Sequence, residues 1–206
     1  MHHHRHLLWI VIPAALLSLT GCDDSKNPLS DPQTSKPDER LIGVWREQGT
    51  DGQGTYYHVG RAGEKFPAGM LRIVEITLTK GKLESPVEYL AYPTVLGDKT
   101  YLNVVLLEPE EIKRLGEKGW NADAVDSYTF LKYQVDGDKL LVWLIDDAAK
   151  KRAITEGKIK GVIVPNKPAM FTDTADKVAR FVAEAGDGLW DMKNPERLER
   201  VVGRKR

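Results

Sequence analysis

The chain has 206 residues, with 30 basic and 30 acidic side chains and therefore no net charge. A balanced charge creates no long-range field that would draw a nucleic acid, so we expect no nucleic-acid partner. An apolar content of 41% with 29% charged residues is typical of a globular domain, and the length is sufficient for one full core.

Residues 1–21 have the three parts of a secretory signal. The basic start MHHHRH precedes the uncharged run LLWIVIPAALLSL, and small residues then lead into Cys22. This order is typical of a signal peptide that is cleaved after export. A membrane span needs about 20 apolar residues, so the run, which Pro13 interrupts, is too short to be one. We therefore predict a signal peptide over residues 1–21.

Cys22 is the single cysteine of the sequence and cannot form an internal disulfide. The motif Leu19-Thr20-Gly21-Cys22 resembles the lipobox of bacterial lipoproteins. In that family the cysteine receives a diacylglyceryl group, the signal is cut before it, and the new N-terminus is acylated. The resemblance implies a covalent lipid anchor on Cys22 in the cell envelope, and two or more chains hold a protein stably at a membrane. Secretion with a free thiol is the alternative.

The segment over residues 22–39 is predicted to be the lipidated cysteine followed by a flexible tether. Its prolines alternate with small polar and charged residues, which offer too little apolar surface to offset the entropy of ordering. Asp23 resembles an inner-membrane retention signal of some enterobacterial lipoproteins, but the choice between inner and outer membrane stays open. A single β-rich domain is expected over residues 40–206.

Alternating apolar and polar residues predict strands through most of this domain. Strands are expected over residues 41–46, 55–59 and 70–79, and a turn at 80–82 leads to a hairpin partner over 83–92. The tripeptide Gly-Asp-Lys occurs at 97–99 and again at 137–139, each time between two apolar strands. Glycine and aspartate tolerate the left-handed backbone of tight hairpins, so both are predicted turns. A further strand is expected over 161–165.

Helices are predicted where the period changes from two to about 3.6 residues. The first spans 109–119, where a proline suits the first helical position, and the second spans 146–157, capped by an aspartate. The third, over 172–186, has an apolar stripe and ends at a glycine. A short fourth helix is expected within residues 195–202.

Seven or eight strands joined mostly by tight turns predict a mainly β fold. Either a β-barrel or a strongly curved antiparallel sheet would protect the edge strands, with two or three short helices, one of them C-terminal. Gly43-Val44-Trp45 resembles the Gly-x-Trp motif of the lipocalins and wider calycins. The resemblance implies a lipocalin-like barrel whose tryptophan plugs one end, with a helix after the last strand. Helices between the strands depart from that family's simple meander, so strand number and an open ligand cup stay undecided.

No pattern in the mature chain predicts catalysis. His58 is the histidine that remains after the signal, and the serines of the folded part, Ser85 and Ser127, are not in a Gly-x-Ser-x-Gly motif. Zinc-ligand spacing, a phosphate loop and a dinucleotide fingerprint are not found either. We expect no enzyme activity, no cofactor and no metal, and a hydrolase that uses two carboxylates is kept as an alternative.

Aromatic residues on or beside the strands are candidate ligand contacts. The five chosen for a pocket are Trp45, Tyr89, Tyr128, Tyr133 and Trp143, and the competing interpretation is that they pack the core. The sequence thus predicts a membrane-anchored bacterial lipoprotein with a non-catalytic domain for a small apolar ligand or lipid. The alternatives are an envelope scaffold or protein-interaction module with a filled core, and the carboxylate hydrolase. No particular protein partner is indicated.

Overall fold

The computed structural model describes residues 24–47 and 53–201. The predicted signal peptide, the lipobox, Cys22 and Asp23 lie outside the described residues. The predicted β-rich domain lies within them, apart from residues 48–52 and 202–206.

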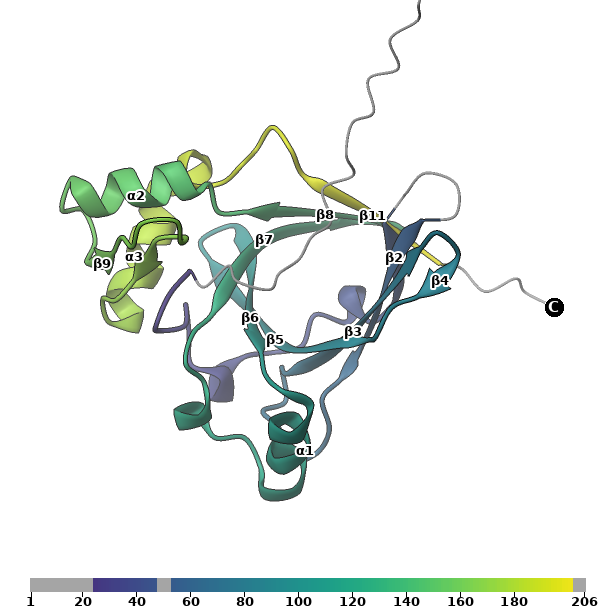
Figure 1. Cartoon of the computed structure of the whole chain (residues 1–206). Helices are drawn as coiled ribbons and strands as arrows, with labels where there is room; N and C mark the ends of the chain where they lie inside the picture. The colour runs from purple at the N-terminus through teal and green to yellow at the C-terminus, as the bar shows by residue number, and fades with distance from the viewer. Residues whose placement is uncertain (1–23, 48–52, 202–206) are drawn as a thin grey trace, which may run out of the picture.

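Eight antiparallel strands close into a barrel (Figure 1). They are β1 (Gly43–Glu47), β2 (Gly54–Arg61), β3 (Leu71–Thr79), β5 (Val87–Leu96), β6 (Lys99–Leu106), β7 (Thr129–Asp136), β8 (Lys139–Leu144) and β11 (Glu196–Arg200). The order around the barrel is β2-β1-β11-β8-β7-β6-β5-β3, and pairing of β2 with β3 completes the circle. A two-residue strand, β4 (Lys82–Leu83), folds back on the end of β3. The prediction of a mainly β barrel with a few short helices is confirmed.

Both Gly-Asp-Lys tripeptides form the hairpin turns that the sequence predicts. Leu96 pairs with Lys99 across the first, and Asp136 pairs with Lys139 across the second. The glycine has φ of +65° in the first turn and +57° in the second. Side chains with a Cβ rarely adopt this left-handed conformation, which explains why glycine occupies both positions.

The last strand corrects two expectations. Residues 195–202 were predicted to contain a short helix, and the third helix was expected to follow the final strand. Instead β11 comes after that helix and bridges β1 and β8, whose edges would otherwise be unpaired. Its sequence ERLER also alternates with period two, so Leu198 is buried while Arg197 and Glu199 are exposed. Closing the barrel satisfies more backbone groups than one isolated turn of helix would, and so the strand is preferred.

Three helices and a small sheet lie outside the barrel (Figure 1). They are α1 (Pro109–Lys118), α2 (Asp147–Thr155), α3 (Ala175–Ala185) and the two-stranded sheet of β9 (Gly161–Val162) with β10 (Met170–Phe171). Asp146 caps α2, because its side chain accepts a hydrogen bond from the Ala149 amide at 3.0 Å. α3 buries Val178 and Val182 completely. The strand that was expected over residues 161–165 is shorter in the structure, where β9 covers only Gly161–Val162.

The segment after Cys22 is not the flexible tether that its composition predicted. The Asp24 amide donates to the Tyr128 carbonyl at 2.9 Å, and the Phe171 amide donates to the Asp24 carbonyl at 2.8 Å. The Leu29 amide donates to the Asn103 side chain at 2.7 Å, deep in the protein. Tertiary partners thus satisfy this segment's polar groups, which local sequence cannot reveal.

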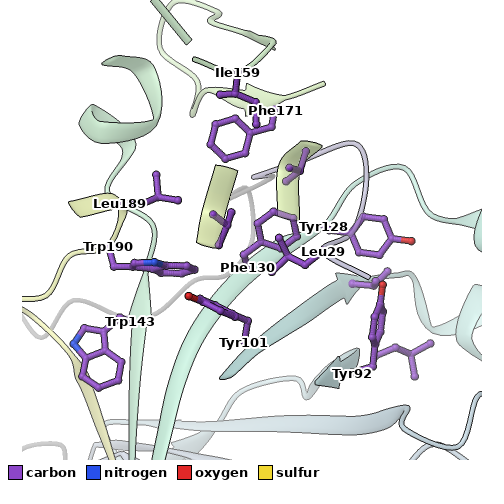
Figure 2. Packing of buried hydrophobic residues seen from close by; sticks show 14 of the residues in the cluster. Leu29, Tyr92, Tyr101, Tyr128, Phe130, Trp143, Ile159, Phe171, Leu189 and Trp190 are labelled. Atoms are coloured by element: carbon purple, nitrogen blue, oxygen red, sulfur yellow. The ribbon is translucent and has the colours of Figure 1, made fainter. Parts of the chain in front are cut away.

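Outside the barrel, a large aromatic core joins β5, β6, β7 and β8 to the segment around Leu29, to α2, α3 and to the small sheet (Figure 2). The rings of Tyr101 and Trp190 lie 5.3 Å apart, and those of Phe171 and Phe181 meet edge to face at 5.5 Å. We call this cluster the outer core. A second cluster, the inner core, fills the barrel and includes Trp45, Tyr89 and Leu131.

Candidate binding site in the barrel

Trp45 is completely buried at one end of the barrel. The indole N–H donates to the Leu41 carbonyl at 2.7 Å, within the 3-10 helix Glu39–Leu41 that precedes β1. The guanidinium of Arg200 lies over the indole ring, 4.2 Å from its centroid. It also donates to the backbone carbonyls of Ile42 and Arg40 at 2.7 and 2.5 Å. This end is therefore sealed by a stacked and hydrogen-bonded plug.

Above the plug the barrel encloses a cavity of about 70 Å³ with an almost wholly apolar lining. Its walls include Leu102, Val104, Leu131 and Val142. A water-sized group needs roughly 10–15 Å³ of such space, so the cavity has room for several such groups. It is much smaller than the 300–1,000 Å³ typical of drug-sized pockets. A small apolar group therefore suits this space, and a drug-sized molecule does not.

Three glutamates stand at the opposite end of the cavity. Glu47 ends β1, two residues beyond Trp45, and Glu196 begins β11, at the far end of that strand from Arg200. Glu75 faces them from β3. Its carboxylate accepts a hydrogen bond from the Tyr89 hydroxyl at 2.9 Å. We call this group the acidic mouth.

The acidic mouth holds protons more tightly than isolated glutamates do. Burial raises the pKa of Glu47 to about 7, and the negative charges of Glu196 and Glu75 and a hydrogen bond with Glu196 add to the effect. Burial also raises the pKa of Glu75 and of Glu196, although hydrogen bonds from neighbours oppose it. Within residues 24–47 and 53–201, no basic side chain forms an ion pair with any of the three. The acids are thus close, partly desolvated and not neutralised.

Tyr57 brings a polar atom to the same place. Its side chain lines the cavity and is 9% exposed. The hydroxyl is buried and has no hydrogen-bond partner among the described residues. Burial, with the nearby charges of Glu75 and Glu47, raises the pKa of this phenol, which therefore stays neutral. A buried hydroxyl without a partner costs about 1–3 kcal/mol, a cost that a ligand could remove.

The structure divides the five predicted pocket residues between the two cores. Trp45 and Tyr89 line the cavity, and Tyr133 lies in the inner core with its hydroxyl donating to Asp38 at 2.9 Å. Tyr128 and Trp143 belong to the outer core, on the outside of the barrel wall, and do not line this cavity. Strand alternation was visible in the sequence, but which face pointed inward depended on how the barrel closed.

The acidic mouth was missed at the sequence level. Glu196 lies in a segment predicted as a helix, and Glu47 follows what was predicted as the end of the first strand. Period-two spacing of Glu47 with Trp45, and of Glu196 with Leu198, is the signal that could have placed both inside the barrel. Three acids from three distant segments show no spacing pattern in the sequence.

His58 and Ser85, two of the candidates for a Ser-His-acid hydrolase, are not part of the acidic mouth. His58 and Ser85 are exposed, and within the part of the chain that the structure describes no group of three or more His, Cys, Asp or Glu side chains could hold a metal ion. The carboxylate hydrolase needs two inward acids in a cleft without an apolar cup. Glu47 and Glu196 are two inward acids, but they lie beside an apolar cavity, which is the feature that this hydrolase should lack.

The comparisons with family models, with curated proteins and with solved structures give no match. Among residues 24–47 and 53–201, every helix is too short or too polar to cross a bilayer.

Proposed function

We propose that the barrel is a non-catalytic binding domain for a small ligand with a narrow apolar body. The observation that carries this proposal is the apolar cavity, which the plug of Trp45 and Arg200 closes at one end and the acidic mouth borders at the other. An apolar chain that enters it leaves water and covers wall residues such as Leu102 and Val142, which is favourable in proportion to the area buried.

We also propose that the protein is a bacterial envelope lipoprotein held at a membrane through lipid on Cys22. The lipobox supports this proposal. Asp24, two residues after Cys22, is firmly attached to the domain. Its carboxylate is 2.5 Å from the Lys150 ammonium, and both side chains are buried. An anchor at Cys22 would therefore orient the domain rather than merely tether it.

The surface beside that attachment suits a membrane. Ser25 bridges to Phe171 of β10, and β10 pairs with β9. At the end of β9 the consecutive residues Val162, Ile163 and Val164 are each more than 40% exposed. Lysines at positions 158, 160 and 167 flank them. Exposed apolar residues among basic ones favour contact with anionic lipid.

The binding proposal is tested with 1-hexanol, a narrow apolar chain without charge. The chain from residue 22, carrying Cys22→Ser, is titrated while backbone amide resonances are followed by NMR. We expect saturable shifts at cavity residues such as Val104 and Leu131, and none in the outer core. Absence of saturable shifts in the barrel would refute the binding function. The anchor is tested separately by the intact mass of protein from its host's membranes, beside a Cys22→Ala variant.

A protein-interaction module with a filled core is the second candidate. The small volume of the cavity favours it, together with two exposed apolar side chains at the strand ends, Leu83 and Val95, which are 69% and 65% exposed. Two results together would favour this function over ligand binding. Hexanol would fail to bind, and the Val142→Leu variant, whose cavity is filled, would still complement the envelope defect of a host that lacks the protein.

A further inference from the structure

We infer that the acidic mouth recognises a positively charged group, so that the ligand of the barrel is an alkylammonium amphiphile. Its chain would enter the apolar cavity and its ammonium would lie among Glu47, Glu75 and Glu196. This inference rests on the proposed binding function, and it adds the chemical class of the ligand.

The first step is the charge of the mouth. Glu196 of β11 lines the apolar cavity, and the negative charges of Glu196 and of Glu75 on β3 act on Glu47 of β1. Lys139 and Arg197 line the groove beside Glu47 and Glu196, but among the described residues no basic side chain forms an ion pair with any of the three acids. Residues 48–52 have the sequence QGTDG, which contains no basic residue. Acids crowded at a partly desolvated site repel each other, and a cation from outside relieves that repulsion.

The second step is the hydroxyl of Tyr57, which is independent of the charge. This buried group lines the cavity and has no partner in the described chain. Its oxygen can accept one N–H, while the carboxylates accept others. An ammonium offers three donors around a compact charge, which matches a phenol oxygen beside several carboxyl groups.

The third step is a coupling between the ligand and protons. With a pKa of about 7, Glu47 is largely protonated below neutral pH when the mouth is empty. A bound ammonium favours the ionised carboxylate, so binding must release a proton from the acidic mouth. Affinity for an alkylammonium should therefore rise with pH through the region around 7, and affinity for an uncharged alcohol should not.

The test compares three probes of one chain length: hexylammonium, 1-hexanol and hexanoate. At pH 8 we expect hexylammonium to bind about tenfold more tightly than hexanol, and hexanoate to bind more weakly than both. At pH 5.5 the advantage of the amine should shrink, and calorimetry in two buffers of different ionisation enthalpy should show proton release near pH 6.5.

Variants locate the effect in the acidic mouth. Glu196→Gln and Glu75→Gln should each weaken hexylammonium binding several-fold while leaving hexanol unchanged. Tyr57→Phe should weaken the amine by a smaller factor. The control is Glu199→Gln, because Glu199 lies on the same strand as Glu196 but is exposed.

Two results would overturn the inference in distinguishable ways. If the amine and the alcohol bind equally at pH 8, the cavity binds ligands but the acidic mouth recognises no charge. If neither binds, the binding function itself fails and the inference fails with it.

Discussion

The inner and outer cores are built from similar side chains but differ in how they are closed. The outer core interlocks aromatic rings from the barrel wall with Leu29, α2, α3 and the small sheet. The inner core leaves a cavity of about 70 Å³ along the barrel axis and ends in three acids. Segments that can shift toward a sheet fill the space against it, whereas hydrogen-bonded strands fix the barrel radius and cannot contract. Binding capacity therefore lies inside the barrel, and orientation of the domain depends on its outside.

The largest expected loss of stability comes from removing the buried ion pair of the outer core. The side chains of Lys150 and Asp24 are 2% and 5% exposed, so Lys150→Met removes a buried cation from the Asp24 carboxylate and should cost about 3–5 kcal/mol of unfolding free energy. Urea denaturation measures it. Lys151→Met is the matched control, since Lys151 forms an exposed pair with Asp147 and its loss should cost at most about 1 kcal/mol. Equal effects of the two variants would show that the Asp24 attachment is not stabilising.

A smaller difference in stability is expected when the same valine-to-leucine substitution is made in each of the two cores. Val178→Leu adds a methylene to the filled outer core and should cost about 1–3 kcal/mol. Val142→Leu adds the same group at the cavity wall, where there is space, and should be nearly neutral. It should also reduce hexanol binding. Thermal unfolding of both variants measures the difference, and equal losses would contradict the contrast between the cores.

The smallest effect concerns the acidic mouth and pH. The folded pKa of Glu47 is about 7 against an ordinary value of 4.5, so the folded state holds more protons than the unfolded state between these values. Stability should therefore decline as pH rises from about 4.5 through 7. Glu47→Gln should reduce this decline, and the elevated pKa values of Glu75 and Glu196 should leave part of it. Melting temperatures across this range provide the measurement. Glu199→Gln, on the exposed face, should leave the slope unchanged.

Much of the architecture was predictable because its signals are local. Alternation marked β3, and the two Gly-Asp-Lys turns required the left-handed backbone that glycine provides. Helices α1, α2 and α3 were indicated by a proline, a capping aspartate and an apolar stripe.

The predictions that were wrong, for the segment after Cys22 and for the last strand, share one physical cause. Residues 24–39 lack the apolar surface to fold alone, and they become ordered because Asn103, Tyr128 and Lys150 supply partners from far along the chain. Residues 196–200 form a strand because two barrel edges needed pairing, not because of their own preference.

The sequence by itself determined the β-rich class, the positions of most turns and helices, and the motif that predicts lipid on Cys22, since each depends on residues that are neighbours in the chain. Tertiary structure alone decided which aromatic residues face inward, how the segment after Cys22 attaches, and that Glu47, Glu75 and Glu196 meet at one mouth. Those outcomes depend on the closure of the barrel, in which β11 joins β1 from more than 140 residues away.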